Sequence, residues 1–344
     1  MGPFCILIRN DNHIMMKVAY FSARPYDIEA FKAQNPRHDI QFIPERFSDE
    51  TARLANESDA LCISPHDKVN DLTLKNLTPG KPSLIVVRSS GFDNVDFNAA
   101  QRRHIIVKWL PGFAPHAIAE HAVTLLLSLN RKTPQAFERV HQGNLSVDGL
   151  MGFNLCNKTV GIIGVGRIGS VFAQIMIGFG CKVIAFDPKK SNATTEDITF
   201  VPLKELFKQS DIISLHCDQN EFSSGIVSRT ALKSVKPNLI LINTARGKLV
   251  DTKAVLEALK EHRISGYGAD VYENEENTFY HKFDSIDAIR DPLLISLIQQ
   301  PGVLLTPHLG FLTMEAMQQV ARTVINELTY YESLNNGSGD QLMV

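Results

Sequence analysis

The stretch 158–188 constrains the fold more than any other part of the chain. It begins with a short apolar run, 159–163, which predicts a buried strand. Three glycines follow with G-x-G-x-x-G spacing, and a second apolar run, 183–186, ends at Asp187. This order of strand, glycine turn, helix and strand is typical of a parallel α/β sheet that binds a dinucleotide. The glycines are Gly164, Gly166 and Gly169, and the helical pattern turns Ile168, Phe172, Ile175 and Phe179 to one face.

Each glycine has a separate physical role in such a site. Gly164 permits a tight turn, Gly166 lets the backbone approach a pyrophosphate, and Gly169 lets the helix pack closely on the strand. The unpaired N–H groups of the helix N-terminus attract the anion. Asp187 can accept hydrogen bonds from the adenosine ribose and would repel a 2′-phosphate, so NAD is the expected cofactor. A glycine-rich turn in an unrelated α/β protein is the alternative interpretation.

Length, charge and cysteine content exclude several classes of protein. A chain of 344 residues is longer than one hydrophobic core usually supports, so two domains are expected. The net charge of −2 and the lack of a basic cluster argue against nucleic-acid binding. Five dispersed cysteines without C-x-x-C spacing indicate reduced thiols of a cytoplasmic protein. No apolar run suggests a membrane span, no spacing suggests a metal site, and residues 1–15 are interpreted as an extension.

From residue 16 onward, strand and helix patterns alternate, which predicts parallel sheets covered by helices. About six strands are expected in the half of the chain that carries the glycine turn. Residues 49–56, 115–131 and 313–333 are predicted to be helical. The predicted strands are 17–21, 40–43, 60–63, 84–87 and 105–108, and then 159–163, 182–186, 211–215, 238–242, 265–271 and 302–306.

Chemically active side chains follow three of the later strands. Arg246 comes after 238–242, Glu275 after 265–271, and His308 after 302–306. Ligands of doubly wound sheets bind beyond the carboxyl ends of the strands, where the glycine turn also lies. Such a set of groups is suited to the reduction of a 2-oxoacid. The arginine can bind the carboxylate, the histidine can transfer a proton, and the acid can orient the histidine. Taken singly, each residue is equally compatible with a surface ion pair, a solvated loop acid or a structural histidine.

Seven segments resemble one family, the D-isomer-specific 2-hydroxyacid dehydrogenases, and within it the fermentative D-lactate branch. The likeness extends over nearly the whole chain from residue 16. NTARG, DVYENE and PH are specific to the family, and VYENE with GFLT favours the lactate branch. The matching segments are SGFDNVD (90–96), PHAIAEHAV (115–123), KTVGIIGVGRIG (158–169), DIISLH (211–216), INTARGKLVD (242–251), GADVYENE (268–275) and TPHLGFLT (306–313).

The resemblance implies an α/β fold of two doubly wound parallel-sheet domains. A Rossmann NAD-binding domain, 113–311, would be inserted into a flavodoxin-like substrate domain formed by 16–112 and 312–337. The activity implied is NAD-dependent reduction of pyruvate to D-lactate. Arg246 would bind the substrate, and His308 with Glu275 would form the acid/base pair. Besides the glycines, the cofactor would contact Arg167, Ile168, Asp187, Cys217, Asp218, Thr244, Ala245 and Asp270, and the substrate would contact Ser90, Gly91, Phe113 and Phe311.

Departures from the family pattern leave the substrate open. Phe113 stands where D-lactate enzymes usually carry tyrosine, so with Phe311 nearby a bulkier acid such as phenylpyruvate or a branched-chain oxoacid is an alternative. On the cofactor side, the chain has Cys217-Asp218 where the family usually has a residue followed by proline. Sibling enzymes that act on phosphoglycerate, glyoxylate or formate, and a non-catalytic NAD-sensing protein, are further alternatives. A small-molecule substrate and a homodimer or homotetramer are expected, with no nucleic-acid or membrane partner. Structural roles are expected for His116, His121 and His216.

Overall fold

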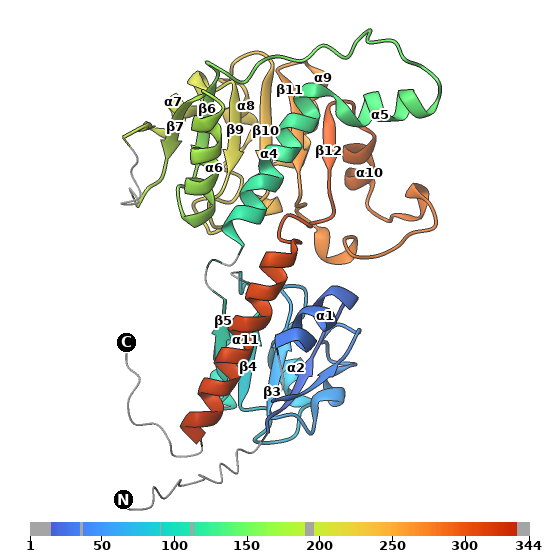
Figure 1. Ribbon diagram of the computed structural model, residues 1–344, viewed down its shortest axis with the longest axis vertical. Coiled ribbons are helices and arrows are strands. Elements are labelled where there is room, and N and C mark those ends of the chain that lie inside the picture. Colours follow the sequence, from blue (N-terminus) through green and yellow to red (C-terminus); the bar gives the residue numbers. More distant parts are fainter. Residues whose placement is uncertain are drawn as a thin grey trace, which may run out of the picture. The chain divides into compact units, whose positions relative to one another are not determined.

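The computed structural model describes residues 15–34, 37–89, 91–110, 112, 114–189 and 196–335. The chain divides into two compact units (Figure 1). The first unit consists of Met1–Phe113 together with Thr313–Val344, and the second consists of Ala114–Leu312. The second unit is therefore an insertion within the first.

The first unit contains a five-stranded parallel sheet in the order β2-β1-β3-β4-β5. This order, with β1 and β3 side by side where the winding reverses, is that of a flavodoxin-like doubly wound fold. The prediction for this part of the chain is thus confirmed. The strands are β1 (Lys17–Tyr20), β2 (Asp39–Phe42), β3 (Ala60–Ile63), β4 (Leu84–Val87) and β5 (Ile106–Trp109), and the helices are α1 (Pro25–Gln34), α2 (Asp71–Lys75), α3 (Phe97–Arg102) and α11 (Met314–Asn335).

The last helix, α11, belongs to this first unit although the whole insertion precedes it in the chain. Its residues Ala321, Val324 and Leu328 are fully buried. A hydrogen bond of 3.0 Å joins His38 Nε2 to Thr329 Oγ1, which ties the helix to the segment before β2. Apolar burial and this polar contact return the chain to the unit in which it began.

The second unit contains a seven-stranded parallel sheet in the order β12-β11-β10-β9-β6-β7-β8. The chain winds outward from β6 in one direction through β7 and β8, and in the other from β9 to β12. The winding therefore reverses between β6 and β9, as in a Rossmann fold. The strands are β6 (Thr159–Ile163), β7 (Lys182–Phe186), β8 (Ile198–Phe200), β9 (Ile212–Leu215), β10 (Leu239–Asn243), β11 (Ile264–Ala269) and β12 (Val303–Leu305), and the helices are α4 (Pro115–Arg131), α5 (Thr133–His141), α6 (Arg167–Gly178), α7 (Leu203–Gln209), α8 (Arg229–Leu232), α9 (Thr252–Lys260) and α10 (Pro292–Gln299).

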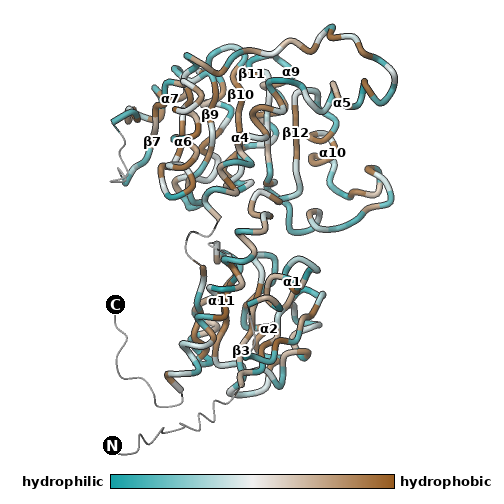
Figure 2. Tube along the Cα trace, viewed as in Figure 1, coloured by the Kyte–Doolittle hydropathy of each residue, from teal (hydrophilic) through white to brown (hydrophobic). Residues whose placement is uncertain are grey.

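Both faces of this sheet are buried, as the alternation of side chains along β10 shows. Ile240 and Ile242 pack into the core beneath α4 and α6. Leu239 and Leu241 pack into the opposite core, together with residues of α7 to α10. Side chains of a strand alternate between the two faces, so a strand covered on both sides must be apolar at every position. The hydropathy colouring of β10 and β12 agrees with this (Figure 2).

Three local predictions differ from the structure. The seventh strand, β8, was missed because it has only three residues, with the exposed Thr199 at its centre. Residues 49–56 form only a short 3-10 turn, Ala52–Ala55, because the Thr51 hydroxyl accepts from the Ser48 N–H and forms a local turn. On α6 the buried side chains are Phe172, Ala173 and Met176, whereas Phe179 is exposed where the helix ends.

Candidate active site on the dinucleotide-binding unit

The glycine turn between β6 and α6 has the geometry that the sequence predicts. Gly164 has φ +93°, and a Cβ atom there would lie 2.7 Å from the backbone of Cys217. A Cβ atom on Gly169 would lie 2.1 Å from the carbonyl oxygen of Gly164. By contrast, a Cβ atom on Gly166 would have no neighbour within 4 Å. Gly164 and Gly169 are therefore required by the protein's own packing, whereas Gly166 faces space that a ligand can fill.

Two polar side chains at the same sheet edge as this turn fit a dinucleotide. Asp187 follows β7, and its two oxygens accept the N–H groups of Val165 and Lys189, each at 2.9 Å. The carboxylate is thus fixed at the strand end with lone pairs remaining for a ribose hydroxyl. Thr244 is buried directly after β10, and its Oγ1 atom has no hydrogen-bond partner among the described residues. A buried hydroxyl of this kind is expected where a ligand supplies the partner.

Arg246 is carried on a tight turn after β10. The fully buried Asn243 organises the turn: its Nδ2 donates to the carbonyl oxygen of Arg246 at 2.9 Å, and its Oδ1 accepts from Ala245 N–H at 3.1 Å. The next residue must be glycine, because a Cβ atom on Gly247 would lie 2.1 Å from the carbonyl carbon of Tyr272. The turn is therefore packed directly against the segment after β11. Arg246 itself is half-buried.

Glu275 and His308 form the hydrogen-bonded pair that the strand ends predict. His308 Nδ1 lies 2.8 Å from Glu275 Oε1, and the other carboxylate oxygen accepts Tyr272 N–H at 3.0 Å. The two side chains are about one-fifth exposed or less, at 19% for His308 and 17% for Glu275. The carboxylate binds Nδ1 and so fixes the orientation of the imidazole ring, with Nε2 as its second titratable nitrogen. The Tyr280 hydroxyl donates to the carbonyl oxygen of His308 at 2.7 Å.

Asp270, at the end of β11, is only 2% exposed and binds the segment that carries His308. It accepts Leu309 N–H at 2.9 Å and Gly310 N–H at 2.7 Å. Burial alone would raise the pKa of Asp270, but hydrogen bonds from His121 and Thr306, together with the electrostatic attraction of His308 and His121, outweigh burial and lower it. Asp270 is therefore an ionised anchor for the turn, in addition to its predicted contact with the cofactor.

The other predicted residues differ in how the structure describes them. Ser90 and Phe113 lie outside the described residues. The carbonyl oxygen of Gly91 accepts a hydrogen bond of 2.6 Å from the Ser89 hydroxyl. Phe311 is half-buried, and its ring centroid lies 6.4 Å from that of His308. The remaining predicted residues, Arg167 and Ile168 at the start of α6, Cys217 and Asp218 after β9, and Ala245 after β10, all lie at the carboxyl edge of the large sheet or at the helix N-terminus that faces it.

The three histidines with a predicted structural role have different surroundings. His116 is exposed on α4. His216 packs on Phe172, and burial lowers its pKa to about 3, so its ring is neutral near pH 7. His121 contacts both Asp270 and Thr306. The position of His121 on a helix did not predict these two contacts, because both partners follow strands that are distant in sequence.

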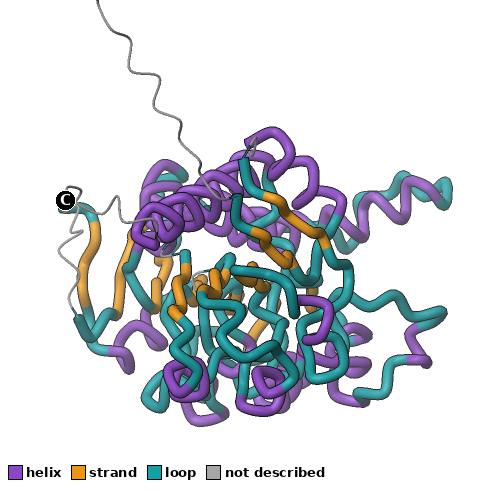
Figure 3. Tube along the Cα trace, turned by 90° about the horizontal axis from the view of Figure 1, so that it is seen from below, coloured by secondary structure: helices purple, strands orange, loops and turns teal. Residues whose placement is uncertain are grey.

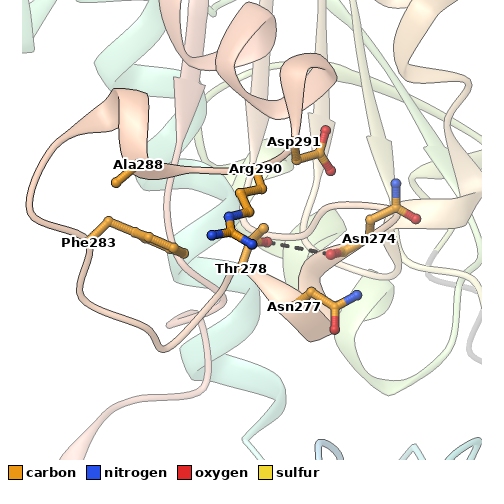
Figure 4. Close-up of a pocket in the computed structure, with 7 residues that line it drawn as sticks. All are labelled: Asn274, Asn277, Thr278, Phe283, Ala288, Arg290 and Asp291. Carbon is orange, nitrogen blue, oxygen red and sulfur yellow. Dashed lines mark hydrogen bonds between the residues drawn. The ribbon is translucent and has the colours of Figure 1, made fainter.

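A pocket lies beside the acid but does not contain the pair. It has a volume of about 390 Å³ and includes Asn274 and Asn277, which flank Glu275 (Figure 4). The Arg290 guanidinium lies between Phe283 and Thr278 in this view. Neither Arg246 nor His308 lines the pocket, so it is separate from the proton-transfer pair. Within the described ranges no group of three or more His, Cys, Asp or Glu residues is arranged to hold a metal ion, and no helix is long and apolar enough to cross a membrane.

Comparison with known proteins agrees with this site. The profile described as "D-isomer specific 2-hydroxyacid dehydrogenase, NAD binding domain" matches residues 123–310. D-lactate dehydrogenase kk1H of Curvularia clavata is 40% identical over 319 residues, which are 91% of each chain. D-lactate dehydrogenase of Escherichia coli K12 is 36% identical over 320 residues, 92% of this chain and 97% of the relative.

Solved structures agree as well. The apo structure of Escherichia coli D-lactate dehydrogenase superposes with a TM-score of 0.84 at 35% identity, covering 94% of this chain and 98% of the other. The pyruvate reductase of Chlamydomonas reinhardtii gives a TM-score of 0.87 at 33% identity, covering 93% and 97%. With the glycine turn, Asp187 and a Thr244 hydroxyl that has no partner in the described part of the chain, the residues present fit NAD. The chain belongs to the D-isomer-specific 2-hydroxyacid dehydrogenase family and is an NAD-dependent dehydrogenase.

Proposed function

We propose that this enzyme interconverts pyruvate and D-lactate with NAD as cofactor. The observation that carries the proposal is the hydrogen bond of 2.8 Å between His308 Nδ1 and Glu275 Oε1, at the same sheet edge as the glycine turn. Support for the substrate comes from relatives that are themselves named D-lactate dehydrogenase, at 36–40% identity. The D-stereospecificity rests on the same likeness.

In the proposed mechanism, NADH supplies a hydride to C2 of the oxoacid when it is bound. His308, protonated on both nitrogens, donates the Nε2 proton to the substrate carbonyl oxygen, and in the reverse direction takes it back. Glu275 holds the ring through Nδ1 and stabilises its positive charge before transfer. Arg246 binds the substrate carboxylate and offsets the negative charge that develops on the carbonyl oxygen.

The proposed contacts to NAD follow from the position of each group. The N–H groups at the start of α6, with Gly166, Arg167 and Ile168, would hold the pyrophosphate. Asp187 would accept the adenosine ribose hydroxyls, and the Thr244 hydroxyl would find in the cofactor the partner that it lacks among the described residues. We propose the remaining contacts, by Cys217, Asp218, Ala245 and Asp270, on family likeness.

We propose the unit formed by the two outer pieces of chain as the substrate domain, with Ser90, Gly91 and Phe113 among its substrate residues. We also propose a cytoplasmic location, because the described cysteines, Cys62, Cys156, Cys181 and Cys217, are all free.

The assignment is tested by replacing His308 with glutamine and measuring NADH oxidation with pyruvate. Loss of the general acid should lower kcat by about a hundredfold to ten-thousandfold. The matched control is His262→Asn. His262 precedes β11 at the opposite edge of the sheet, and asparagine tolerates its φ of +54°. Near-normal turnover by H308Q would overturn the role of His308, and binding of NADH without turnover of any 2-oxoacid by the wild type would overturn the proposed reaction.

A bulkier 2-oxoacid is the second candidate substrate, and Phe311 is the observation that favours it. Its half-buried ring stands nearly perpendicular to that of His308, with an interplanar angle of 73°. An aromatic wall beside the proton donor would contact the side chain of phenylpyruvate or of a branched-chain oxoacid. Comparing kcat/KM for pyruvate and phenylpyruvate decides between the two, because each added apolar group in a fitting pocket gains about tenfold or more.

We propose that the enzyme is a homo-oligomer that associates through the arm formed by α5 and the loop 142–152. Figures 1 and 3 show this helix extended away from the sheet of its unit. None of the residues of α5 is buried. Apolar side chains nevertheless concentrate there, and Val147 and Met151 are 80% and 88% exposed. An apolar surface of this kind indicates a protein partner, and a second copy of the chain is the simplest one.

Light scattering coupled to size exclusion measures the oligomeric state. Wild type should elute as a dimer or tetramer, and Phe137→Asp, which places a charge at an exposed apolar position of α5, should shift it toward the monomer. A wild-type monomer at micromolar concentration would contradict the proposal.

A further inference from the structure

His121 lies beneath the turn that carries His308. It projects from α4, and its Nε2 atom is 3.0 Å from Thr306 Oγ1 and 3.3 Å from Asp270 Oδ1. The side chain is 12% exposed, and that of Asp270 is 2% exposed. These contacts join a helix at the start of the unit to the ends of β11 and β12, which lie about 150 or more residues further along the chain.

The chemistry of the partners determines where the protons are. Asp270 is a carboxylate and can only accept. The Thr306 hydroxyl donates its single proton to Asp270 Oδ1, so its oxygen is an acceptor toward His121. The Nε2 atom of His121 must therefore carry a hydrogen, which it shares between the hydroxyl and the carboxylate.

This network orders the backbone on both sides of His308. Thr306 lies two residues before it, and Asp270 accepts the N–H groups of Leu309 and Gly310, the two residues after it. His308 has φ +56°, a left-handed conformation that non-glycine residues adopt only when the surroundings hold it. The His121 ring also packs against the turn, since a Cβ atom on Gly310 would lie 3.2 Å from His121 Cδ2.

We propose that His121 is a positioning residue for His308: its Nε2–H group holds Thr306 and Asp270, and through them the strained turn that presents the imidazole. The inference rests on the proposed role of His308 as proton donor. Glu275 orients the ring from the side-chain end, whereas His121, Thr306 and Asp270 fix its backbone. The contacts of His121 are with Thr306, Asp270 and the turn at Gly310.

The test compares two substitutions that differ in a single donor. His121→Gln places an amide N–H close to the position of Nε2, and His121→Phe keeps a ring of similar size without a donor. H121F should lower kcat by on the order of tenfold to a hundredfold, the effect of a small displacement of a catalytic group. H121Q should stay within about threefold of the wild type.

A second readout needs no turnover. Diethylpyrocarbonate modification of His308, followed by peptide mass spectrometry, should be faster in H121F, because the released turn leaves the imidazole less often bonded to Glu275. This measurement separates failure of the inference from failure of the proposed function, which would appear as a wild-type enzyme without turnover of any 2-oxoacid.

The inference is overturned if H121F turns over and is modified as the wild type is, or if H121Q is as impaired as H121F. If H121F does not fold, the variants Thr306→Val and Thr306→Ser test the same hydrogen bond from the side of Thr306. T306V removes the hydroxyl and should reproduce the loss in kcat, whereas T306S keeps the hydroxyl and should not. Equal activity of T306V and T306S would overturn it as well.

Discussion

Two glycines of α6, Gly169 and Gly178, and its N-cap residue Gly166 should respond to alanine in three different ways. A methyl group on Gly169 would lie 2.1 Å from the Gly164 carbonyl oxygen, and ordinary contact begins at 3.4 Å, so strand and helix must separate by about 1.3 Å. Overpacking of this kind costs about 1–3 kcal/mol. For a unit of this size the loss corresponds to a melting temperature lower by about 2–12 °C.

Gly166→Ala should change the stability of the protein little. Its φ of −81° suits alanine, and nothing lies within 4 Å of the new methyl group. Reduced entropy of the unfolded chain favours alanine by about 0.4–1 kcal/mol, but alanine is a poorer N-cap than glycine, so the two effects offset each other in the cofactor-free protein. The methyl group occupies the space proposed for the pyrophosphate, so the affinity for NADH should fall by about tenfold to two-hundredfold, the range for one misplaced carbon.

Gly178→Ala is the matched control, because it lies on the same helix and its methyl group also meets nothing within 4 Å. It should gain stability, by up to about 1 kcal/mol, without losing affinity. Calorimetry of the cofactor-free proteins and fluorescence titration with NADH measure both quantities. The reasoning is refuted if G166A binds NADH as tightly as G178A does, or if G169A melts no lower than the wild type.

Two further predictions concern charge. The pKa of His216 is lowered by burial to about 3, against about 6.5 in an unfolded chain. Between these pH values only the unfolded state binds a proton at His216. The contribution of the neutral ring to the free energy of unfolding is therefore fully present above about pH 6.5 and is lost as the pH falls toward 3. Urea unfolding of His216→Phe should show a flatter slope over that window; an unchanged slope would contradict the shift. Asp187→Asn removes the charge that disfavours a 2′-phosphate, so the ratio of kcat/KM for NADH over NADPH should fall by about tenfold to a hundredfold; an unaltered ratio would exclude Asp187 as the discriminating residue.

Periodicity predicted the two sheets well because their central strands are covered on both faces. Runs such as Leu239–Asn243 are apolar at nearly every position, and the residue that ends each run marks the sheet edge at which ligands bind. The prediction failed where the signal is short or local. The three-residue strand Ile198–Phe200 has too few positions to show a period, and the turn near Thr51 is decided by side-chain hydrogen bonds.

The same distinction applies to the site. Chemical type and position at a strand end indicated Arg246, Glu275 and His308, and the structure brings Glu275 and His308 within hydrogen-bond distance. The supporting residues carried no such signal. Tyr280 bonds the His308 carbonyl oxygen, and His121 bonds Thr306 across more than half of the chain, so each looked like an ordinary residue of its own segment.

The sequence by itself determined the order of strands and helices, the glycine turn for NAD and the chemical groups at the strand ends, because these depend on local patterns of polarity and backbone freedom. Only the tertiary structure decided which of those groups meet and how they are held. Asp270 receives N–H groups from a turn 39 and 40 residues away, and it holds His308 in a left-handed conformation that its own sequence disfavours. Contacts of that kind arise from the packing of separate strands, and no periodicity within one segment records them.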